Sequence, residues 1–319
     1  GLPGPIVAAV CGELRRRSVL AATRPTRLAD EWRAELGPPA APTESELVAT
    51  LAALAATAPQ PRSELDQSHC TVETKARRAL LLLQAGAVDG RRVLFLGDDD
   101  LTSLAVDRLP VRTTELAVVD VDPAVLAHLR RHLPAATLVE HDLREPLPAA
   151  LAGRFDTVFT DPPYTIAGAE LFLSRAAAAL RPGVGGDVFL AFGPKPPAET
   201  LRLQAAIAAM GLVIRSFERN FNEYAQASIL GGTSHLYHLT STGETQPLVA
   251  GAHRGPLYTG EGRAPRRYRC ASCGTMQLVG CGAAWSTVDL LRSDGCPECG
   301  GTRFLPQPRR APADRERGQ

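Results

Sequence analysis

Residues 91–100 read RRVLFLGDDD, and this stretch decides the fold class. The four residues VLFL at 93–96 form a short, uninterrupted apolar run, which is typical of a strand buried on both faces of a parallel sheet. Gly97 follows, where nucleotide-binding folds carry several glycines that let the backbone approach a ligand. In this chain a single glycine is followed by three carboxylates, Asp98, Asp99 and Asp100. We therefore expect the first strand of an α/β sheet that ends in an acidic turn.

Other apolar runs follow along the chain, and helical stretches alternate with them. The runs lie at 92–96, 116–119, 137–139, 157–160, 187–192, 213–217 and 235–239, and the helical stretches at 73–85, 123–132, 169–180 and 197–210. This alternation predicts a doubly wound α/β fold, in which helices cover both faces of a mostly parallel sheet. The last two runs are close together, which indicates a final antiparallel pair. Such an arrangement is that of class I S-adenosylmethionine-type transferases.

The overall composition fits a soluble globular protein. The chain has 319 residues, of which 45% are hydrophobic and 22% charged, and 35 basic side chains nearly balance 34 acidic ones. No whole-protein field therefore draws it to nucleic acid or to a membrane. The longest uncharged apolar stretch, 47–59, is shorter than the roughly 18 residues that suggest a membrane span, and no secretory signal opens the chain. We expect a cytoplasmic protein without a membrane or nucleic-acid partner.

Differences in composition and sequence pattern divide the chain into five segments. We expect a helical N-terminal domain at 1–65, a Rossmann-like catalytic domain at 66–242, a Gly/Pro-rich linker at 243–265, a zinc-ribbon-like module at 266–305 and a disordered tail at 306–319. Helical patterns in the first segment lie at 6–17, 27–36 and 43–57, and Thr43 with Glu46 forms a capping signature for the last of them. A winged-helix unit and a helical dimerisation or lid domain are both compatible with these patterns.

Carboxylates follow the ends of four successive predicted strands. Because ligands bind beyond the carboxyl ends of the strands in open α/β sheets, these side chains should gather around one site. Asp120 lies 23 residues after Gly97, close to the distance at which an acidic residue takes ribose hydroxyls. Asp142 is placed to accept from an adenine amino group. The candidate binding residues of this adenosine-type site are Gly97, Asp98, Asp99, Asp100, Asp120, Asp122, Asp142, Pro162 and Pro163.

The acidic turn discriminates between possible ligands. The α-carboxylate of S-adenosylmethionine would be repelled by three aspartates, since like charges about 4 Å apart cost about 4 kcal/mol at an effective dielectric of 20. Decarboxylated S-adenosylmethionine presents only an ammonium, which the turn attracts. A solvated acidic turn or the N-terminus of a helix is the structural alternative.

Several motifs together resemble those of the branched-chain polyamine synthases, the N4-bis(aminopropyl)spermidine synthases. They are GDDDLTSLA at 97–105, QSHCTVET at 67–74, HDLR at 141–144, DPPYT at 161–165, LFLSR at 171–175 and GGTS at 231–234. The resemblance covers roughly residues 65–242. It implies transfer of the aminopropyl group of decarboxylated S-adenosylmethionine to an amine of a spermidine-type polyamine, with a branched product and release of methylthioadenosine. We also expect a homodimer.

This activity requires a neutral acceptor amine, although amines of pKa near 10 are charged at pH 7. A carboxylate must therefore take the proton, and Asp161, at the end of the fourth strand, is the catalytic candidate. Asp98, Asp99 and Asp100 would bind the aminopropyl ammonium and the polycation. Tyr164 stands where archaeal members carry Glu; it would face the reaction centre and hold a cation on its ring, or else be a packing residue.

Two other functions are compatible with the sequence. The Asp-Pro-Pro-Tyr motif also occurs in S-adenosylmethionine-dependent N-methyltransferases that grip a flipped nucleic-acid base, although the missing glycine loop argues against one. A zinc-ribbon scaffold with an inactive transferase domain would leave all the acidic strand ends idle. The polar run 222–224 lines the acceptor pocket in one interpretation and forms a surface turn in the other.

Two CxxC pairs near the C-terminus predict a tetrahedral zinc site. Cys270 and Cys273 are separated by 22 residues from Cys296 and Cys299, which is the spacing of two zinc knuckles. A module this small has too little core to fold without a metal, so we expect the zinc to be structural. Cys281 is a spare cysteine. Nucleic-acid binding is the alternative role of such a ribbon.

Overall fold

The computed structural model describes residues 10–11, 13–14, 41–225, 232–259, 265–280, 283–285 and 288–308. The predicted helix at 27–36, most of that at 6–17, residue Cys281 and most of the predicted tail lie outside these ranges. The choice between a winged-helix unit and another helical domain therefore also falls outside the described residues.

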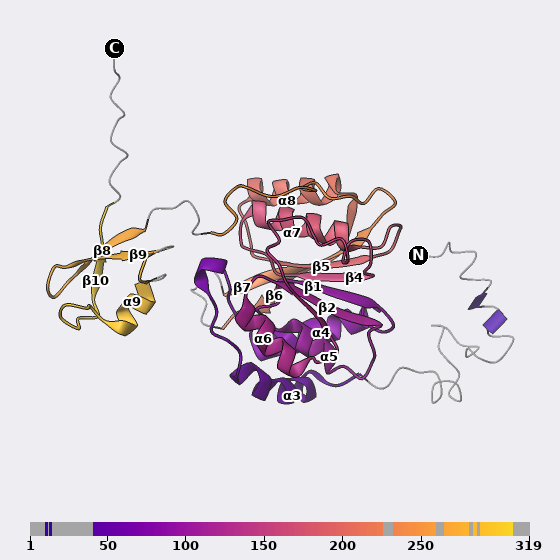
Figure 1. Cartoon of the computed structure of the whole chain (residues 1–319), viewed down its shortest axis with the longest axis horizontal. Helices are drawn as coiled ribbons and strands as arrows, with labels where there is room; N and C mark the ends of the chain where they lie inside the picture. Colours follow the sequence, from indigo (N-terminus) through magenta and orange to yellow (C-terminus); the bar gives the residue numbers. More distant parts are fainter. Residues whose placement is uncertain are drawn as a thin grey trace, which may run out of the picture.

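Seven strands form one mixed sheet in the order β3-β2-β1-β4-β5-β7-β6 (Figure 1). Their bounds are β1 Arg92–Leu96, β2 Glu115–Asp120, β3 Thr137–Glu140, β4 Thr157–Thr160, β5 Asp187–Phe192, β6 Leu212–Glu223 and β7 Thr233–Ser241. The first five strands are parallel, and β7 is antiparallel to both β5 and β6. The predicted class I transferase arrangement, with its final antiparallel pair, is confirmed.

Helices cover both faces of this sheet (Figure 1). The helices are α3 Glu44–Ala56, α4 Val72–Gln84, α5 Thr102–Asp107, α6 Pro123–His132, α7 Ile166–Ala179 and α8 Pro197–Ala209. Successive side chains of a strand point to opposite faces, so Leu94 and Leu96 join the core beneath α7 and α8. Val93 and Phe95 join the core on the side of α4, α5 and α6. Every one of these four side chains is fully buried, which explains why β1 is apolar throughout.

Helix α3 begins with the predicted capping box. The Thr43 side chain accepts from the backbone of Glu46, and the Glu46 carboxylate accepts from the backbone N–H of Thr43 at 2.7 Å. Leu47 and Leu51, each 2% exposed, enter the same core as Val93. Helix α3 therefore packs on the sheet unit, although the sequence places it in a separate N-terminal segment.

Residues 243–259 differ from the predicted linker. Leu257 is 1% exposed and belongs to the core on the α7 side of the sheet. The buried guanidinium of Arg175 donates to the carbonyl oxygens of Val249, at 2.6 Å, and of Gly251, at 2.8 Å. The Gly and Pro content of this segment suggests a linker that does not pack on the sheet. Apolar side chains and the buried Arg175 nevertheless hold it against the domain.

The C-terminal module is a small unit of its own. A three-stranded antiparallel sheet has the order β10-β8-β9, with β8 Arg266–Cys270, β9 Met276–Val279 and β10 Phe304–Pro306, and helix α9 spans Val288–Asp294. Among the described residues of the module, the buried core consists of Val279, Leu291 and Phe304 besides two cysteines, and Tyr268, Trp285 and Val288 pack against it partly buried. So few buried apolar side chains agree with a module that depends on a metal.

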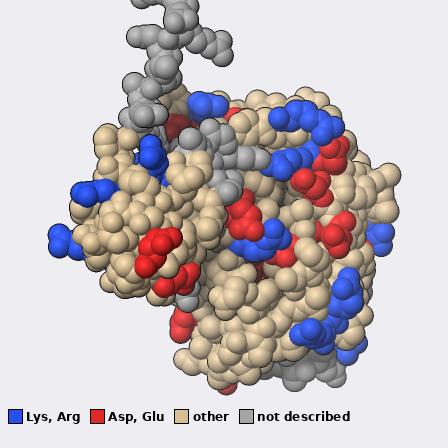
Figure 2. All heavy atoms as spheres, turned by 60° about the vertical axis from the view of Figure 1, so that its left-hand side comes forward, with Lys and Arg blue, Asp and Glu red and all other residues tan. Residues whose placement is uncertain are grey.

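Charges of both signs alternate over the face of the molecule shown in Figure 2, rather than forming one basic patch. This distribution agrees with the formal net charge of +1. Among the described helices, none has the length and apolar character needed to cross a bilayer.

Candidate active site

Two neighbouring cavities open at the carboxyl ends of the central strands. The larger has an open volume of about 530 Å³ and is bounded by residues that follow β1, β2, β3 and β4, among them Gly97, Asp120, Asp142 and Pro163. The smaller has about 190 Å³ and is lined by Pro162 and by two tyrosines described below. Asp66, Asp99 and Asp161 line both cavities. A ligand that extends from one cavity into the other must therefore pass these three carboxylates.

The three aspartates of the acidic turn have three different environments. Asp98 is 2% exposed and holds the first turn of α5, because it accepts from both the backbone N–H and the hydroxyl of Ser103. Burial raises the pKa of Asp98 to about 7. The lining residues of the two cavities do not include Asp98. Asp98 therefore holds the turn in place, and its predicted contact with the ligand stays a prediction.

Asp100 pairs with groups of the protein. Its carboxylate accepts from Nη1 of Arg78 at 2.6 Å and from the backbone N–H of Cys70, and Lys75 Nζ donates to its carbonyl oxygen at 2.5 Å. Burial by itself would raise the pKa of Asp100, but Arg78 and Lys75 outweigh it and hold the pKa below its usual range. Asp100 still lines the smaller cavity. Its negative charge is already compensated before any ligand binds.

Asp99 is the member of the turn that faces both cavities. It is partly exposed, and the backbone N–H of Ser68 donates to its Oδ2 at 3.3 Å. Within the described ranges, no ion pair involves Asp99. Burial, together with Asp100 and Asp120, raises its pKa well above the usual value. Asp99 is thus a carboxylate that a bound cation would stabilise in its charged form.

Asp161 lies at the end of β4, between the two cavities. Its Oδ2 accepts from the Tyr224 hydroxyl at 2.6 Å and from Nη2 of Arg78 at 2.8 Å. Burial raises the pKa of Asp161 to about 7, although Arg78 opposes the rise. A carboxylate with a raised pKa and a fixed orientation, beside a cavity, suits general-base chemistry near neutral pH.

Of the remaining predicted binding residues, some line a cavity and others stabilise the backbone around it. Asp120 lines the larger cavity and accepts from the N–H groups of Asp98, at 2.9 Å, and Asp122, at 2.7 Å. Asp142 lines the same cavity. Asp122 instead caps α6 by accepting from Ala124 N–H at 2.9 Å, and it is 1% exposed. Asp122 therefore fixes the start of α6, and its predicted contact with a ligand stays a prediction.

Gly97 and Tyr164 also occupy informative positions. Gly97 has a φ of +70°, so the single glycine of the turn serves a backbone conformation that other residues rarely adopt. The Tyr164 ring lines the smaller cavity and meets Tyr224 edge-on, with centroids 6.1 Å apart. On its other side it packs near Phe192, at 6.4 Å. Tyr164 is therefore both a packing residue and part of the cavity wall.

Several contributors to the site were missed from the sequence, and three of them are polar residues that bear on the proposed chemistry. Arg78 lies on α4, Asp66 precedes that helix, and Tyr258 closes the larger cavity from the predicted linker. A signal existed for Arg78, since it stands four residues before Leu82 on the apolar stripe of an amphipathic helix. The polar run 222–224 resolves in favour of the pocket for Tyr224, which is 7% exposed and lines the smaller cavity.

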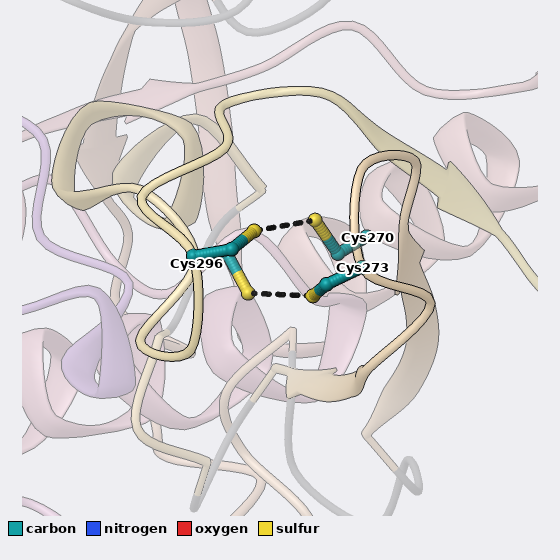
Figure 3. Close-up of side chains that lie close together, drawn as sticks. Cys270, Cys273 and Cys296 are labelled. Carbon is teal, nitrogen blue, oxygen red and sulfur yellow. Dashed lines mark hydrogen bonds between the residues drawn. The ribbon is translucent and has the colours of Figure 1, made fainter.

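The four cysteines of the C-terminal module form one cluster. The sulfurs of Cys270 and Cys299 are 3.6 Å apart, as are those of Cys273 and Cys296, and all four lie within 4.8 Å of one another (Figure 3). Four sulfurs at 2.3 Å from a tetrahedral zinc ion are about 3.8 Å apart, so the cluster has the size that zinc requires. These distances and the thiolate donor set are consistent with a zinc site.

The backbone around the cysteines forms two tight knuckles. Gly274 N–H donates to the carbonyl of Cys270 at 3.0 Å, and Gly300 N–H donates to that of Cys296 at 2.7 Å. Both glycines have positive φ, +79° and +70°, as the predicted knuckles need. Each CxxC pair therefore presents its two sulfurs from one preformed turn.

The sequence is similar to that of known proteins. Residues 46–242 match the family described as the branched-chain polyamine synthase A C-terminal domain. N(4)-bis(aminopropyl)spermidine synthase of Thermus thermophilus is 36% identical over 173 residues, which cover 52% of this chain and 50% of the relative. An uncharacterized protein of Methanocaldococcus jannaschii is 37% identical over 250 residues, 75% of this chain and 60% of the relative. The chain thus spans between half and three fifths of the length of these relatives.

A solved structure shares the fold. The branched-chain polyamine synthase from Thermus thermophilus, in complex with N4-aminopropylspermidine and 5′-methylthioadenosine, superposes with a TM-score of 0.63 at 24% identity. The match covers 81% of this chain and 84% of that one.

Proposed function

The chain belongs to the branched-chain polyamine synthase family, and on that premise we propose that it is an aminopropyltransferase. Its donor would be decarboxylated S-adenosylmethionine and its acceptor an amine of a spermidine-type polyamine, with methylthioadenosine as the second product. The two molecules named in complex with the Thermus thermophilus synthase, N4-aminopropylspermidine and 5′-methylthioadenosine, support this assignment.

The observation that carries the proposal is the excess of carboxylates where the two cavities meet. Asp66, Asp99 and Asp161 line both cavities, and burial raises the pKa of each. Buried carboxylates are costly in their charged form unless a cation accompanies them. An ammonium or sulfonium ligand supplies that cation, whereas a ligand carrying a carboxylate adds to the repulsion.

The larger cavity suits the adenosine part of the donor. Asp120 and Asp142 follow the second and third strands and lie in its wall, where ribose and adenine are expected in this fold. The aminopropyl arm would extend past Asp99 toward the smaller cavity, where the acceptor amine would lie between Asp161 and Tyr164. Tyr164 and Tyr224 line that cavity, and the face of a tyrosine ring can hold a cation.

The transfer would be a single in-line displacement. The lone pair of the acceptor nitrogen forms a bond to the aminopropyl methylene, and the bond from that carbon to the sulfonium sulfur breaks. Sulfur keeps the electron pair and leaves as neutral methylthioadenosine. Asp161 takes the proton that the acceptor must lose in order to attack.

An N-methyltransferase acting on nucleic acid is the competing function, because it also fits the fold and the Asp-Pro-Pro-Tyr motif. Its donor carries an α-carboxylate, which Asp99 at the end of β1 would repel. Incubating the protein with spermidine and each donor in turn, followed by mass spectrometry, decides between the two. Aminopropylated polyamine supports the proposal, and products formed only from S-adenosylmethionine refute it.

We further propose that the four cysteines hold one structural zinc ion, which would supply folding energy to a module with a small core. The enzyme would act as a cytoplasmic homodimer. Light scattering of the purified protein tests the oligomeric state.

A further inference from the structure

We propose that Arg78 is the positioning residue of this site: it orients the Asp161 carboxylate and sets the pH at which that carboxylate becomes a base. The inference rests on the proposed function, because it assigns Asp161 the acceptor proton.

Arg78 connects the two carboxylates that flank the smaller cavity. Arg78 lies on α4 and its side chain is completely buried. Its Nη1 is 2.6 Å from the Asp100 carboxylate, and its Nη2 is 2.8 Å from that of Asp161. These carboxylates come from the ends of two different strands, β1 and β4. One guanidinium thus links both strand ends, with the planar geometry that lysine lacks.

The remaining contacts hold the guanidinium in place. Nε donates to the Asn222 amide oxygen at 2.7 Å, and the guanidinium carbon lies 5.2 Å from the centre of the Phe159 ring. Asn222 is itself held, since its amide nitrogen donates to Ser234 at 2.9 Å. Every nitrogen of Arg78 is therefore engaged by the protein, and it is not placed to bind a ligand directly.

This arrangement controls one oxygen of Asp161. Both the Arg78 bond and the Tyr224 bond end on Oδ2. The carboxylate rotation is thereby fixed, and we assign the other oxygen, Oδ1, to the acceptor amine. A base held in this way keeps its geometry while the substrates enter and leave.

Arg78 also sets the proton affinity of Asp161. Burial favours the neutral carboxyl, and the positive charge of Arg78 opposes it. The other titratable groups facing this position are Asp66, Asp99, Asp100, Tyr164 and Tyr224. The carboxyl groups add negative charge when ionised. Lys75 and Lys195 donate to the carbonyl oxygens of Asp100 and Tyr164, so Arg78 is the cation that contacts the base directly and keeps it available near pH 7.

The test compares pH profiles of aminopropyl transfer for wild type, Arg78→Met and Arg78→Lys. We expect the acidic limb of kcat to move upward by at least one pH unit in Arg78→Met, and by less in Arg78→Lys, which keeps the charge but not the fork. Arg181→Gln is the control, because it removes an ion pair with Asp156 at the amino end of β4, whereas Asp161 lies at the carboxyl end of that strand. The inference is overturned if the acidic limb of the kcat profile lies at the same pH in Arg78→Met as in the wild type and activity is lowered equally at all pH values.

Two further measurements keep the inference decidable. Asn222→Ala removes a bond to Nε without changing the charge, so kcat should fall while the limb stays where it is. Infrared titration of the Asp161 carboxyl band, identified by its loss in Asp161→Asn, reports the same pKa without turnover. If the wild type transfers no aminopropyl group, the proposed function fails, and the infrared shift between wild type and Arg78→Met still decides the role of Arg78: an upward shift supports it and no shift overturns it.

Discussion

Replacing Asp99 by Asn should remove much of the preference for a decarboxylated donor. Asp99 faces both cavities and has no ion-pair partner among the described residues, so a bound cation would be the partner that stabilises its charged form. A pair of unit charges about 4 Å apart is worth about 4 kcal/mol at an effective dielectric of 20. The cavity is open to water and the side chain is partly exposed, so we expect about 1.4 kcal/mol or more to remain, which is at least tenfold in Kd.

Calorimetric titration with both donors checks this prediction. The wild type should bind decarboxylated S-adenosylmethionine at least tenfold more tightly than S-adenosylmethionine, and Asp99→Asn should bring the two Kd values together. Asp142→Asn is the matched control, because Asp142 lines the larger cavity, where we propose that the adenosine shared by both donors binds. It should weaken both donors by the same factor.

Equal affinities of the wild type for the two donors would refute the electrostatic reasoning. An unchanged ratio in Asp99→Asn would also refute it, because the discrimination would then arise elsewhere in the cavity.

Four further outcomes are expected. Asp161→Asn should lower turnover by roughly 10²–10⁴ at saturating substrates with little change in donor affinity, since it removes the base but keeps the shape; near wild-type turnover would place the proton elsewhere. Binding of the cationic donor should release protons and tighten as the pH rises toward 8, because the pKa values of Asp99 and Asp161 are raised in the free site and a cation lowers them; calorimetry in buffers of different ionisation enthalpy measures the release, and proton uptake would contradict it. Purified protein should contain about one zinc per chain by elemental analysis, and its removal should unfold the C-terminal module while the seven-stranded sheet keeps its circular dichroism; an ordered metal-free module would count against a structural zinc. Thr43→Ala should lower the free energy of unfolding by about 1 kcal/mol in a denaturant titration, because it removes the cap of α3, and no change would mean that α3 adds nothing to global stability.

The sheet could be predicted from the sequence because its central strands are apolar on both faces. In β5, for example, all six residues are buried, and no other element type fits so short a continuous run between helical stretches. Helix α5 was not predicted, since it has six residues and follows Leu101, which adopts an unusual positive φ of +56°. Strand β6 extends well beyond the predicted 213–217, because register shifts let it continue past its apolar part.

The site was predictable only in part, for a related reason. A residue's position at a strand end follows from the chain, and Asp99 and Asp161 were placed that way. Which neighbour neutralises a carboxylate depends on tertiary contacts, and nothing near residue 100 shows that Asp100 meets Arg78 on α4 while Asp98 turns to Ser103. The ligand roles of the predicted residues stay predictions.

The segment 243–259 has a consequence for how this enzyme family can diversify. Leu257 and Tyr258 form part of the wall of the larger cavity, and Thr259 bonds to Asp66, which lines the same cavity, yet these residues follow the stretch 46–242 that matches the family. Recombination at that boundary would exchange one wall of the cavity while leaving the base and the acidic turn intact. Ligand preference can thus evolve separately from the reaction, and a fragment cut at residue 242 would lose one side of its binding site while keeping every proposed reactive group.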